Sequence, residues 1–582
     1  MNTGNIHDTS NGYAPPSVAS SPSTTRGANL PYITYEAEAG AYSGTLQSWN
    51  PSINEGPGDP GGEASGRQAV RLASQGSYVE WTASAKANAL TMRYSIPDHP
   101  NGSGLDFSIS IYRNGTKIDT FNLTSRYAWL YGSESLPTDS PSSGPPRKIY
   151  DESHLLLSQT INASDKIRIQ KDSGDKSPYY DIDFVELEFV RPIQQRAGSY
   201  SVTAEGADPT GMSDSTAAFI SARDKAGLGG TVWIPPGFYR MTAKIDAKGR
   251  NFHGAGPWYS TMWGANSWPI KSVDKTGFFV TGSNSVFKDF SIWGESHHRD
   301  SGDSAFVANF GDNAALYNIW IEHVDLGIYV GWSNDPPLPT NIRIDSCRVR
   351  NITADGIHLK YGTQNSIILN SNVRNAGDDS IVIWSGAGDA RPVKNNLITN
   401  NTVQNVWRAS GIALAGGEGN TVEYCVVKDT LVYPGVNIET AFNPTPFAGI
   451  TTVRHLDLIR CGGKYWGHTP YPAIWVMSEY HGYDAPINFS DVSIVNASFQ
   501  AIQFSAVRKP GVSPAEYGVF TPGSVRFDNV AITNAGTNGI VVDSTVAGGA
   551  TFNNVSISSS GDKLVNNAGT KFVLTKTGTN DW

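Results

Sequence analysis

The sequence predicts an all-β protein in which an antiparallel β-sandwich precedes a right-handed parallel β-helix. Glycine accounts for 60 of the 582 residues, which indicates many tight turns. The first part of the chain contains short strands of alternating polarity. The later part repeats one short apolar pattern at a period typical of a solenoid coil.

The composition changes along the chain and divides it into four parts. Residues 1–30 are rich in Ser, Thr, Pro, Gly and Asn, so we expect a disordered leader or linker there. Alternating runs such as Leu105–Tyr112 predict the sandwich over residues 31–191. A linker over residues 192–199 then leads to the β-helix, which we place at residues 200–582.

The β-helix is predicted from a recurring run in which a small residue precedes an apolar position. Successive runs begin 24 to 38 residues apart, which fits coils of three short strands with insertions. Asparagine-rich strands lie between the runs, and Asn suits coil corners because it tolerates left-handed backbone. The runs are Gly327–Val330, Gly356–Leu359, Ser380–Ile383, Gly411–Leu414, Gly435–Ile438, Ala473–Val476, Ala501–Phe504 and Gly539–Val542.

Three aspartates precede two equivalent runs of this repeat. Asp355 comes directly before Gly356, and the pair Asp378 and Asp379 follows 23 residues after Asp355. Stacked strands lie about 4.8 Å apart, so we expect the three carboxylates to converge. Their repulsion is costly, which favours a task such as acid/base catalysis or cation binding. The alternative is that they satisfy coil turns or bind calcium.

Charge and composition exclude several classes of function. The net charge of −9, without a basic run, argues against partners such as nucleic acid or an anionic membrane surface. No apolar stretch approaches the roughly 18 residues that a membrane helix needs. The N-terminus lacks the charged and apolar regions of a signal peptide. The three cysteines have neither zinc-site nor disulfide spacing, and we expect buried thiols.

The motifs around the aspartates resemble the catalytic core of polygalacturonases. Asp-Gly-Ile stands at 355–357 and Gly-Asp-Asp-Ser-Ile at 377–381, while residues 206–239 resemble the first coil of pectin-acting β-helix enzymes. The family's Gly-His-Gly turn is replaced by Ala-Ser-Gly at 409–411, and its Arg-Ile-Lys strand by Asn-Ile-Glu at 437–439. The cations that resemblance assigns to uronate binding are therefore missing, and we expect a neutral sugar.

The whole combination resembles glycoside hydrolase family 87, the α-1,3-glucanases and mycodextranases, over residues 31–582. The resemblance implies endo-hydrolysis of α-1,3-glucan with inversion, catalysed by Asp355, Asp378 and Asp379. Asp378 matches the acid of the polygalacturonases, which leaves Asp355 and Asp379 to activate water. Inversion typically uses carboxyl groups about 6.5–9.5 Å apart.

Substrate contacts are expected from side chains on the same face of the solenoid, built up by insertions near residues 385–394, 440–450 and 463–472. Trp384 is the leading candidate for a stacking platform, ahead of Trp332, Trp407, Trp466 and Trp475. The further candidates are His358, Arg408 and Glu439.

The sandwich resembles carbohydrate-binding modules of families 6 and 35. The match rests on the opening Glu36-Ala-Glu38 and on Asp183 in the closing strand. The resemblance implies a structural calcium ion (Ca2+) held by these three carboxylates, a ligand set that suits a hard cation. Catalysis itself is expected to need no cofactor.

Several alternatives remain open at this stage. A mycodextranase or another β-helix polysaccharide hydrolase would share the motifs. A polysaccharide lyase would need a uronate substrate and a basic proton abstractor, and a non-catalytic adhesin would leave the three carboxylates unexplained. We expect a monomer. We also expect secretion, because the polysaccharide substrate is extracellular.

Overall fold

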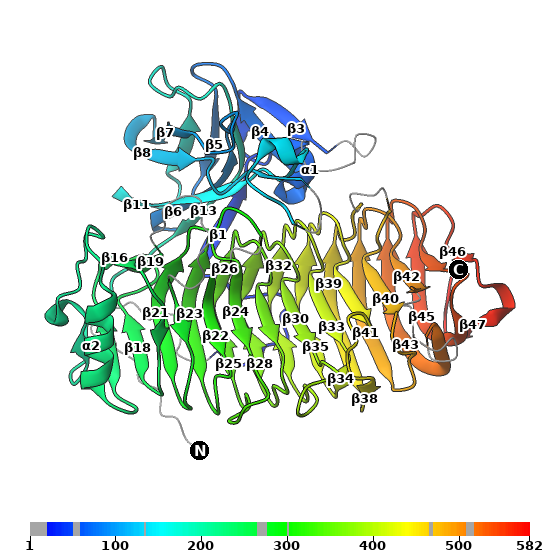
Figure 1. Ribbon diagram of the computed structural model, residues 1–582. Coiled ribbons are helices and arrows are strands. Elements are labelled where there is room, and N and C mark those ends of the chain that lie inside the picture. Colours follow the sequence, from blue (N-terminus) through cyan, green and yellow to red (C-terminus); the bar gives the residue numbers. More distant parts are fainter. Residues whose placement is uncertain are drawn as a thin grey trace.

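The computed structural model describes residues 20–49, 59–132, 136–264, 276–299, 302–464, 469–507 and 517–582. Figure 1 shows a sandwich of antiparallel strands on the flank of a long parallel β-helix. The predicted fold class is therefore confirmed. No helix in the described ranges is long and apolar enough to cross a membrane.

The sandwich consists of two antiparallel sheets around one core. Trp81, Tyr94 and Phe121 are almost completely buried in this core, as the alternating polarity of their strands predicts. One sheet contains β1 (Tyr32–Glu36), β3 (Thr45–Ser48), β4 (Gln68–Leu72), β6 (Ala87–Ser95), β11 (Asp151–Ile161) and β13 (Tyr180–Glu188). The other contains β2 (Ala41–Tyr42), β5 (Tyr78–Thr82), β7 (Asp106–Arg113), β8 (Thr116–Thr124) and β12 (Lys166–Gln170).

The β-helix is built from two long parallel sheets that enclose a continuous apolar interior. The larger sheet runs from β14 (Tyr200–Ser201) to β47 (Phe572–Thr577). The helix α2 (Thr216–Ala226) lies at the first coil, where Phe219 is fully buried in the interior. The smaller sheet contains β17 (Ile245–Asp246), β20 (Phe278–Phe279), β22 (Ser304–Ala308), β24 (Leu326–Val330), β27 (Ile357–Leu359), β30 (Ile381–Trp384), β33 (Ile412–Ala415), β37 (Val436–Glu439), β40 (Ile474–Ser478), β42 (Ile502–Ala506), β44 (Ile540–Val542) and β46 (Leu564–Asn566).

Asparagines at the coil corners adopt left-handed backbone, as their enrichment predicts. Asn341 has φ 58° and Asn313 has φ 60°. The side-chain amide of Asn341 donates to Asn313 Oδ1 at 3.2 Å, and that of Asn313 donates to Asn284 Oδ1 at 3.1 Å. Such ladders tie each coil to the next and satisfy polar groups at the turns.

The two domains meet through a buried network of charges. Arg374 donates to Glu152 at 2.7 Å and to Glu186 at 2.6 Å, and Arg350 donates to Glu186 at 3.1 Å. These four side chains are at most 3% exposed. Removing one partner of a buried ion pair leaves an uncompensated charge, so this network fixes the sandwich on the β-helix.

Residues 20–30 differ from the predicted disordered leader, of which residues 1–19 lie outside the described ranges. The Ser23 amide donates to Asn400 Oδ1 at 2.9 Å, and the Gly27 amide donates to the Tyr424 carbonyl at 2.8 Å. Composition alone indicates disorder here because the partners of this segment lie more than 300 residues away.

Candidate active site

The three aspartates converge at the start of two neighbouring strands. β27 and β30 pair in parallel, with Ile357 opposite Ile381. One carboxylate oxygen from each of Asp355, Asp378 and Asp379 lies within 4.8 Å of the other two. The repeat spacing therefore predicts the geometry of this cluster.

Two glycines allow this close approach of the coils. A Cβ atom at Gly356 would lie 2.3 Å from the Ser380 carbonyl oxygen, and one at Gly377 would lie 2.3 Å from that of Thr353. Real Cβ atoms do not tolerate such contacts, so glycine is required where the backbones meet.

Asp378 is held by two arginines. Its Oδ2 accepts a hydrogen bond from Arg408 Nη1 at 2.9 Å and another from Arg299. Burial and the neighbouring Asp355 raise the pKa of Asp378 above its ordinary value, and the two guanidinium groups reverse this rise only in part. Two charge-assisted hydrogen bonds favour the ionised form of this carboxylate.

Asp379 lies in a different electrostatic environment. Its Oδ1 accepts a hydrogen bond from the Ser410 amide at 2.8 Å. Burial, followed by repulsion from Asp378, Glu439 and Asp355, raises its pKa well above the ordinary value. The proton of the cluster is therefore best retained on Asp379.

Glu439 extends the acidic cluster along the solenoid. It is 9% exposed, and the Asn437 side chain donates to its Oε2 at 2.8 Å. Burial, Glu479 and Asp378 raise its pKa to about 7. The structure thus places a carboxyl group, rather than a uronate-binding cation, beside the catalytic candidates.

His358 and Trp384 lie on the outward face of β27 and β30. His358 Nδ1 is 2.9 Å from Asp355 Oδ2, and its ring centroid is 4.7 Å from that of Tyr329. Lys360 Nζ lies 4.1 Å from the centroid of the Trp384 ring and donates to the Tyr329 hydroxyl at 3.1 Å. Both predicted contact residues therefore belong to one polar and aromatic patch beside the acids.

The other tryptophan candidates divide between the core and the surface. Trp407 and Trp475 are 1% and 8% exposed and have structural positions, whereas Trp332 is 60% exposed. Trp466 lies outside the described residues. Phe442, which the sequence does not single out, is 73% exposed after β37.

Arg299 is the functional candidate that sequence reasoning misses most clearly. It precedes Asp378 by 79 residues and belongs to no repeat position or motif. Its guanidinium group also donates to the Gly377 carbonyl at 3.1 Å. The only local signal is its place in the polar run Glu295–Arg299 directly after an apolar strand.

The predicted calcium ligands do not form one group of three. Asp183 pairs with Arg93 inside the sandwich, while burial and the nearby Glu36 raise its pKa well above the ordinary value. Among the described residues, two clusters bring three such ligand atoms within 4.8 Å, and this set is not one of them. Glu36 Oε2 and Glu38 Oε2, however, are buried without a hydrogen-bond partner.

The surroundings of Glu36 and Glu38 suit a cation. Burial raises the pKa of Glu36, and burial raises that of Glu38 to about 7. Asp429 of the β-helix adds to the pKa increase of both groups. These two carboxylates therefore fit a cation at the domain interface, and the part of Asp183 as a third ligand stays a prediction.

Comparison with known proteins gives one consistent family. Residues 29–190 match the family model of the α-1,3-glucanase catalytic domain D1, and residues 211–582 match that of the α-1,3-glucanase catalytic domain D2. No curated protein matches the chain.

Solved structures with the same architecture cover both domains. The Agl-KA catalytic domain is 29% identical with a TM-score of 0.85, covering 96% of this chain and 100% of its own. The catalytic unit of the thermostable GH87 α-1,3-glucanase from Streptomyces thermodiastaticus strain HF3-3 is 30% identical with a TM-score of 0.82, covering 96% of this chain and 97% of its own. A variant GH87 α-1,3-glucanase catalytic domain in complex with tetrasaccharides is 27% identical with a TM-score of 0.79, covering 96% of this chain and 100% of its own. The chain is therefore a glycoside hydrolase of family 87 that belongs to the α-1,3-glucanases.

Proposed function

We propose that this enzyme hydrolyses internal α-1,3-glucosidic linkages of α-1,3-glucan with inversion of the anomeric configuration. The observation that carries the proposal is the cluster of Asp355, Asp378 and Asp379, in which the pKa of Asp379 is raised well above the ordinary value while two guanidinium groups counteract the rise at Asp378. Related catalytic domains have been solved with nigerose and with tetrasaccharides.

The acid in this mechanism is Asp379. It donates its proton to the glycosidic oxygen, the bond to the anomeric carbon breaks, and the leaving sugar departs with a hydroxyl group. The sequence comparison points to Asp378 as the acid, but Arg299 and Arg408 favour its ionised form. We therefore exchange the roles of the two adjacent aspartates.

The nucleophile is a water molecule between the two remaining carboxylates. Asp378 orients it, and Asp355 accepts its proton as the oxygen attacks the anomeric carbon. His358 Nδ1, 2.9 Å from Asp355, positions this base. The balance of protons closes when Asp355 returns its proton to solvent and Asp379 regains one.

The close spacing of the carboxylates also supports a second mechanism. Oxygens within 4.8 Å are nearer than the separation of about 6.5–9.5 Å that is usual for inversion. A retaining displacement, in which one carboxylate attacks the sugar, typically uses a separation of about 5–5.5 Å. Proton NMR of a fresh digest of insoluble α-1,3-glucan decides between them, since β-anomeric ends indicate inversion and α-anomeric ends retention.

Endo-action is supported by aromatic side chains on both sides of the acids. Trp332 follows β24, which is next to β27 in the sheet, and Phe442 follows β37, which is two strands beyond β30. Glucosyl units can therefore extend along several coils in both directions. A mycodextranase would share these side chains, and digestion of a glucan with alternating α-1,3 and α-1,4 linkages distinguishes the two activities.

Location, oligomeric state and a calcium ion are properties of the whole molecule. We propose secretion and a monomeric state, in keeping with an insoluble substrate. A structural calcium ion held by Glu36 and Glu38 would join the sandwich to the β-helix through charge at their interface. Catalysis proceeds from the aspartates without it.

A further inference from the structure

A cleft lies between the sandwich and the first coils of the β-helix, away from β27 and β30. It has a volume of about 610 Å³, which falls in the range of about 300–1,000 Å³ typical of ligand sites. Its walls come from β6, β7, β8 and β11 of the sandwich and from β16 (Gly237–Met241), β19 (Ser260–Gly264), β21 (Val286–Trp293) and β23 (Ala315–Glu322) of the β-helix.

Three half-buried aromatic rings form one wall of this cleft. The Phe238 ring centroid lies 5.3 Å from that of Trp263 and 5.9 Å from that of Trp293. These three rings are part of neither the hydrophobic core of the β-helix nor that of the sandwich, as the described residues define them. Ring faces that neither core absorbs present an apolar surface for a ligand.

Polar groups at the cleft are suited to hydroxyl groups. Asp106 and Asn122 are exposed at the rim, and Glu295 accepts a hydrogen bond from Trp263 Nε1 at 3.1 Å. Trp293 Nε1 is buried and has no hydrogen-bond partner among the described residues. None of the described lining residues is Lys or Arg, so the cleft is unsuited to an anionic ligand.

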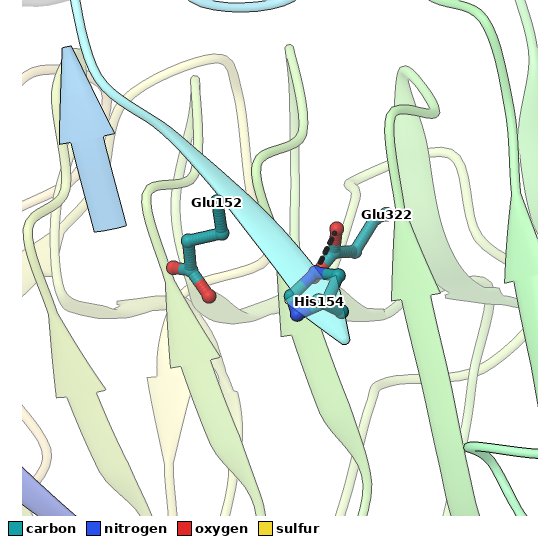
Figure 2. Close-up of side chains that lie close together, drawn as sticks. All are labelled: Glu152, His154 and Glu322. Atoms are coloured by element: carbon teal, nitrogen blue, oxygen red, sulfur yellow. Dashed lines mark hydrogen bonds and ion pairs between the residues drawn. The ribbon is translucent and has the colours of Figure 1, made fainter. Parts of the chain in front are cut away.

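The acidic side chains at the base of the cleft do not form a metal site. Figure 2 shows Glu152 and His154 on β11 with Glu322 opposite them, and their ligand atoms lie within 4.8 Å of one another. Glu152 accepts two hydrogen bonds from Arg374 at 2.7 Å. Glu322 accepts from Trp320 Nε1 at 2.7 Å and lies 2.9 Å from His154 Nε2. These contacts already occupy the oxygen and nitrogen atoms that would bind a metal ion.

One short segment joins the cleft to the catalytic residues. Gly294 and Glu295 line the cleft, and Arg299, four residues after Glu295, donates to Asp378. A ligand in the cleft therefore contacts the same backbone segment that positions Arg299 beside Asp378.

We propose that this cleft is an accessory binding site for a neutral α-glucan segment, with Phe238, Trp263 and Trp293 stacking on its sugar rings. The aromatic wall offers apolar faces for C–H groups, and the carboxylate and amide oxygens at its edges accept hydrogen bonds from hydroxyl groups. The choice of α-1,3-glucan as the ligand rests on the proposed function. The site would hold insoluble substrate on the same molecule as the catalytic aspartates.

The test uses the full chain with Asp379→Asn, which prevents cleavage, and isothermal titration with an α-1,3-linked glucotetraose. We expect two binding sites, and we expect the added double substitution Trp263→Ala and Trp293→Ala to abolish one of them. The matched variant with Trp263→Phe and Trp293→Phe keeps aromatic faces and should retain both sites. A single site in the parent chain, or two unchanged sites in the alanine variant, would overturn the proposal.

A measurement on the Asp379→Asn chain without tryptophan substitutions guards against misfolding of the alanine variant and limits cleavage of the tetraose. Oxidation of tryptophan by N-bromosuccinimide, mapped by peptide mass spectrometry, should be slowed by the tetraose at Trp263 and Trp293 as well as at Trp384. Protection at Trp384 alone would refute the accessory site and leave the proposed function intact. Two-site binding without hydrolysis of α-1,3-glucan by the unsubstituted enzyme would refute the proposed function and support the accessory site.

Discussion

Arg408 Nη1 donates to Asp378 Oδ2 at 2.9 Å, across one coil of the solenoid. This contact, together with that of Arg299, separates the roles of two adjacent aspartates that the sequence alone leaves alike. Asp378 has two cationic partners, whereas Asp379 faces three carboxylates. In the proposed mechanism this difference in charge environment makes Asp379 the acid and leaves Asp378 to orient the water.

Replacing Arg408 by alanine is expected to shift the acidic limb of the pH–activity profile upward. Asp378 must be ionised to orient water, and loss of a neighbouring cation raises its pKa further. The profile of kcat/KM against pH on soluble glucan oligosaccharides measures this shift. Arg408→Lys keeps the charge and should shift the limb less, and an unchanged limb in Arg408→Ala would contradict the role of this pair.

Asp379→Asn is expected to lower hydrolysis of glucan by about 10²–10⁴-fold, because the leaving oxygen loses its proton donor. α-Glucosyl fluoride, whose leaving group needs little protonation, should lose much less. The matched variant Asp378→Asn should lose activity on both substrates. If the fluoride rescues Asp378→Asn instead, the assignment of the acid is wrong.

Glu439→Gln is expected to move the basic limb of the profile to lower pH. Glu439 is one of the charges that raise the pKa of Asp379, so its removal allows Asp379 to lose the catalytic proton sooner. Activity at acidic pH should change little. The measurement is kcat/KM between pH 4 and 9 for the two proteins, and a basic limb that stays in place would exclude this coupling.

Acid should weaken the attachment of the sandwich through Glu152. Its pKa is lowered from 4.5 to about 2, mainly because Arg374 and Arg350 outweigh the effect of burial. The depressed pKa contributes stability that is complete above the unfolded value and is lost as pH falls from about 4.5 towards 2. Urea unfolding across this range measures the loss.

A matched pair of variants checks the same network at neutral pH. Arg374→Met leaves Glu152 and Glu186 without their main partner and should cost about 3–5 kcal/mol in the free energy of unfolding. Lys166→Met, which removes a 61% exposed lysine side chain of the sandwich, should cost less than 1 kcal/mol. Equal losses in the two variants would contradict a structural role for the buried network.

Chelation of calcium is expected to lower the thermal midpoint of the unsubstituted protein. The midpoint of a variant with Glu36→Gln and Glu38→Gln should not respond to the chelator. A ligand that binds only the folded state stabilises it in proportion to the logarithm of its concentration. Scanning calorimetry with EGTA and with added Ca2+ provides the measurement. If neither EGTA nor Ca2+ changes the midpoint of the unsubstituted protein, the proposed calcium site is wrong.

The repeat pattern predicts whatever depends on strand register. Asp355 and Asp378 converge because equivalent positions of neighbouring coils stack, and the same logic places Glu439 beside them. Arg299 comes from a connecting segment that has no register, so spacing carries no information about it. Resemblance to the polygalacturonases assigns the acid to Asp378, whereas the contact of Asp378 with Arg299 supports the proposal that Asp379 is the acid.

Burial of charge is the second property that the sequence does not reveal. Asp183 matches a calcium motif, but its partner Arg93 lies on another strand of the same sheet and forms a buried ion pair with it. Residues 20–30 have the composition of a disordered segment, and only the folded solenoid provides their partners. Long-range pairing, rather than local propensity, decides both cases.

The segment at residues 20–30 has a consequence for how the solenoid unfolds. A repeat protein is linked mainly through nearest neighbours and can lose its end coils one at a time. Here Ser20 contacts Asp345 while Arg26 reaches Asp457 and Asp491, so one continuous strap crosses several coils. Opening any of those coils requires releasing the strap from its neighbours. The central coils that carry the catalytic aspartates should therefore melt as a single cooperative block, later than the uncovered ends.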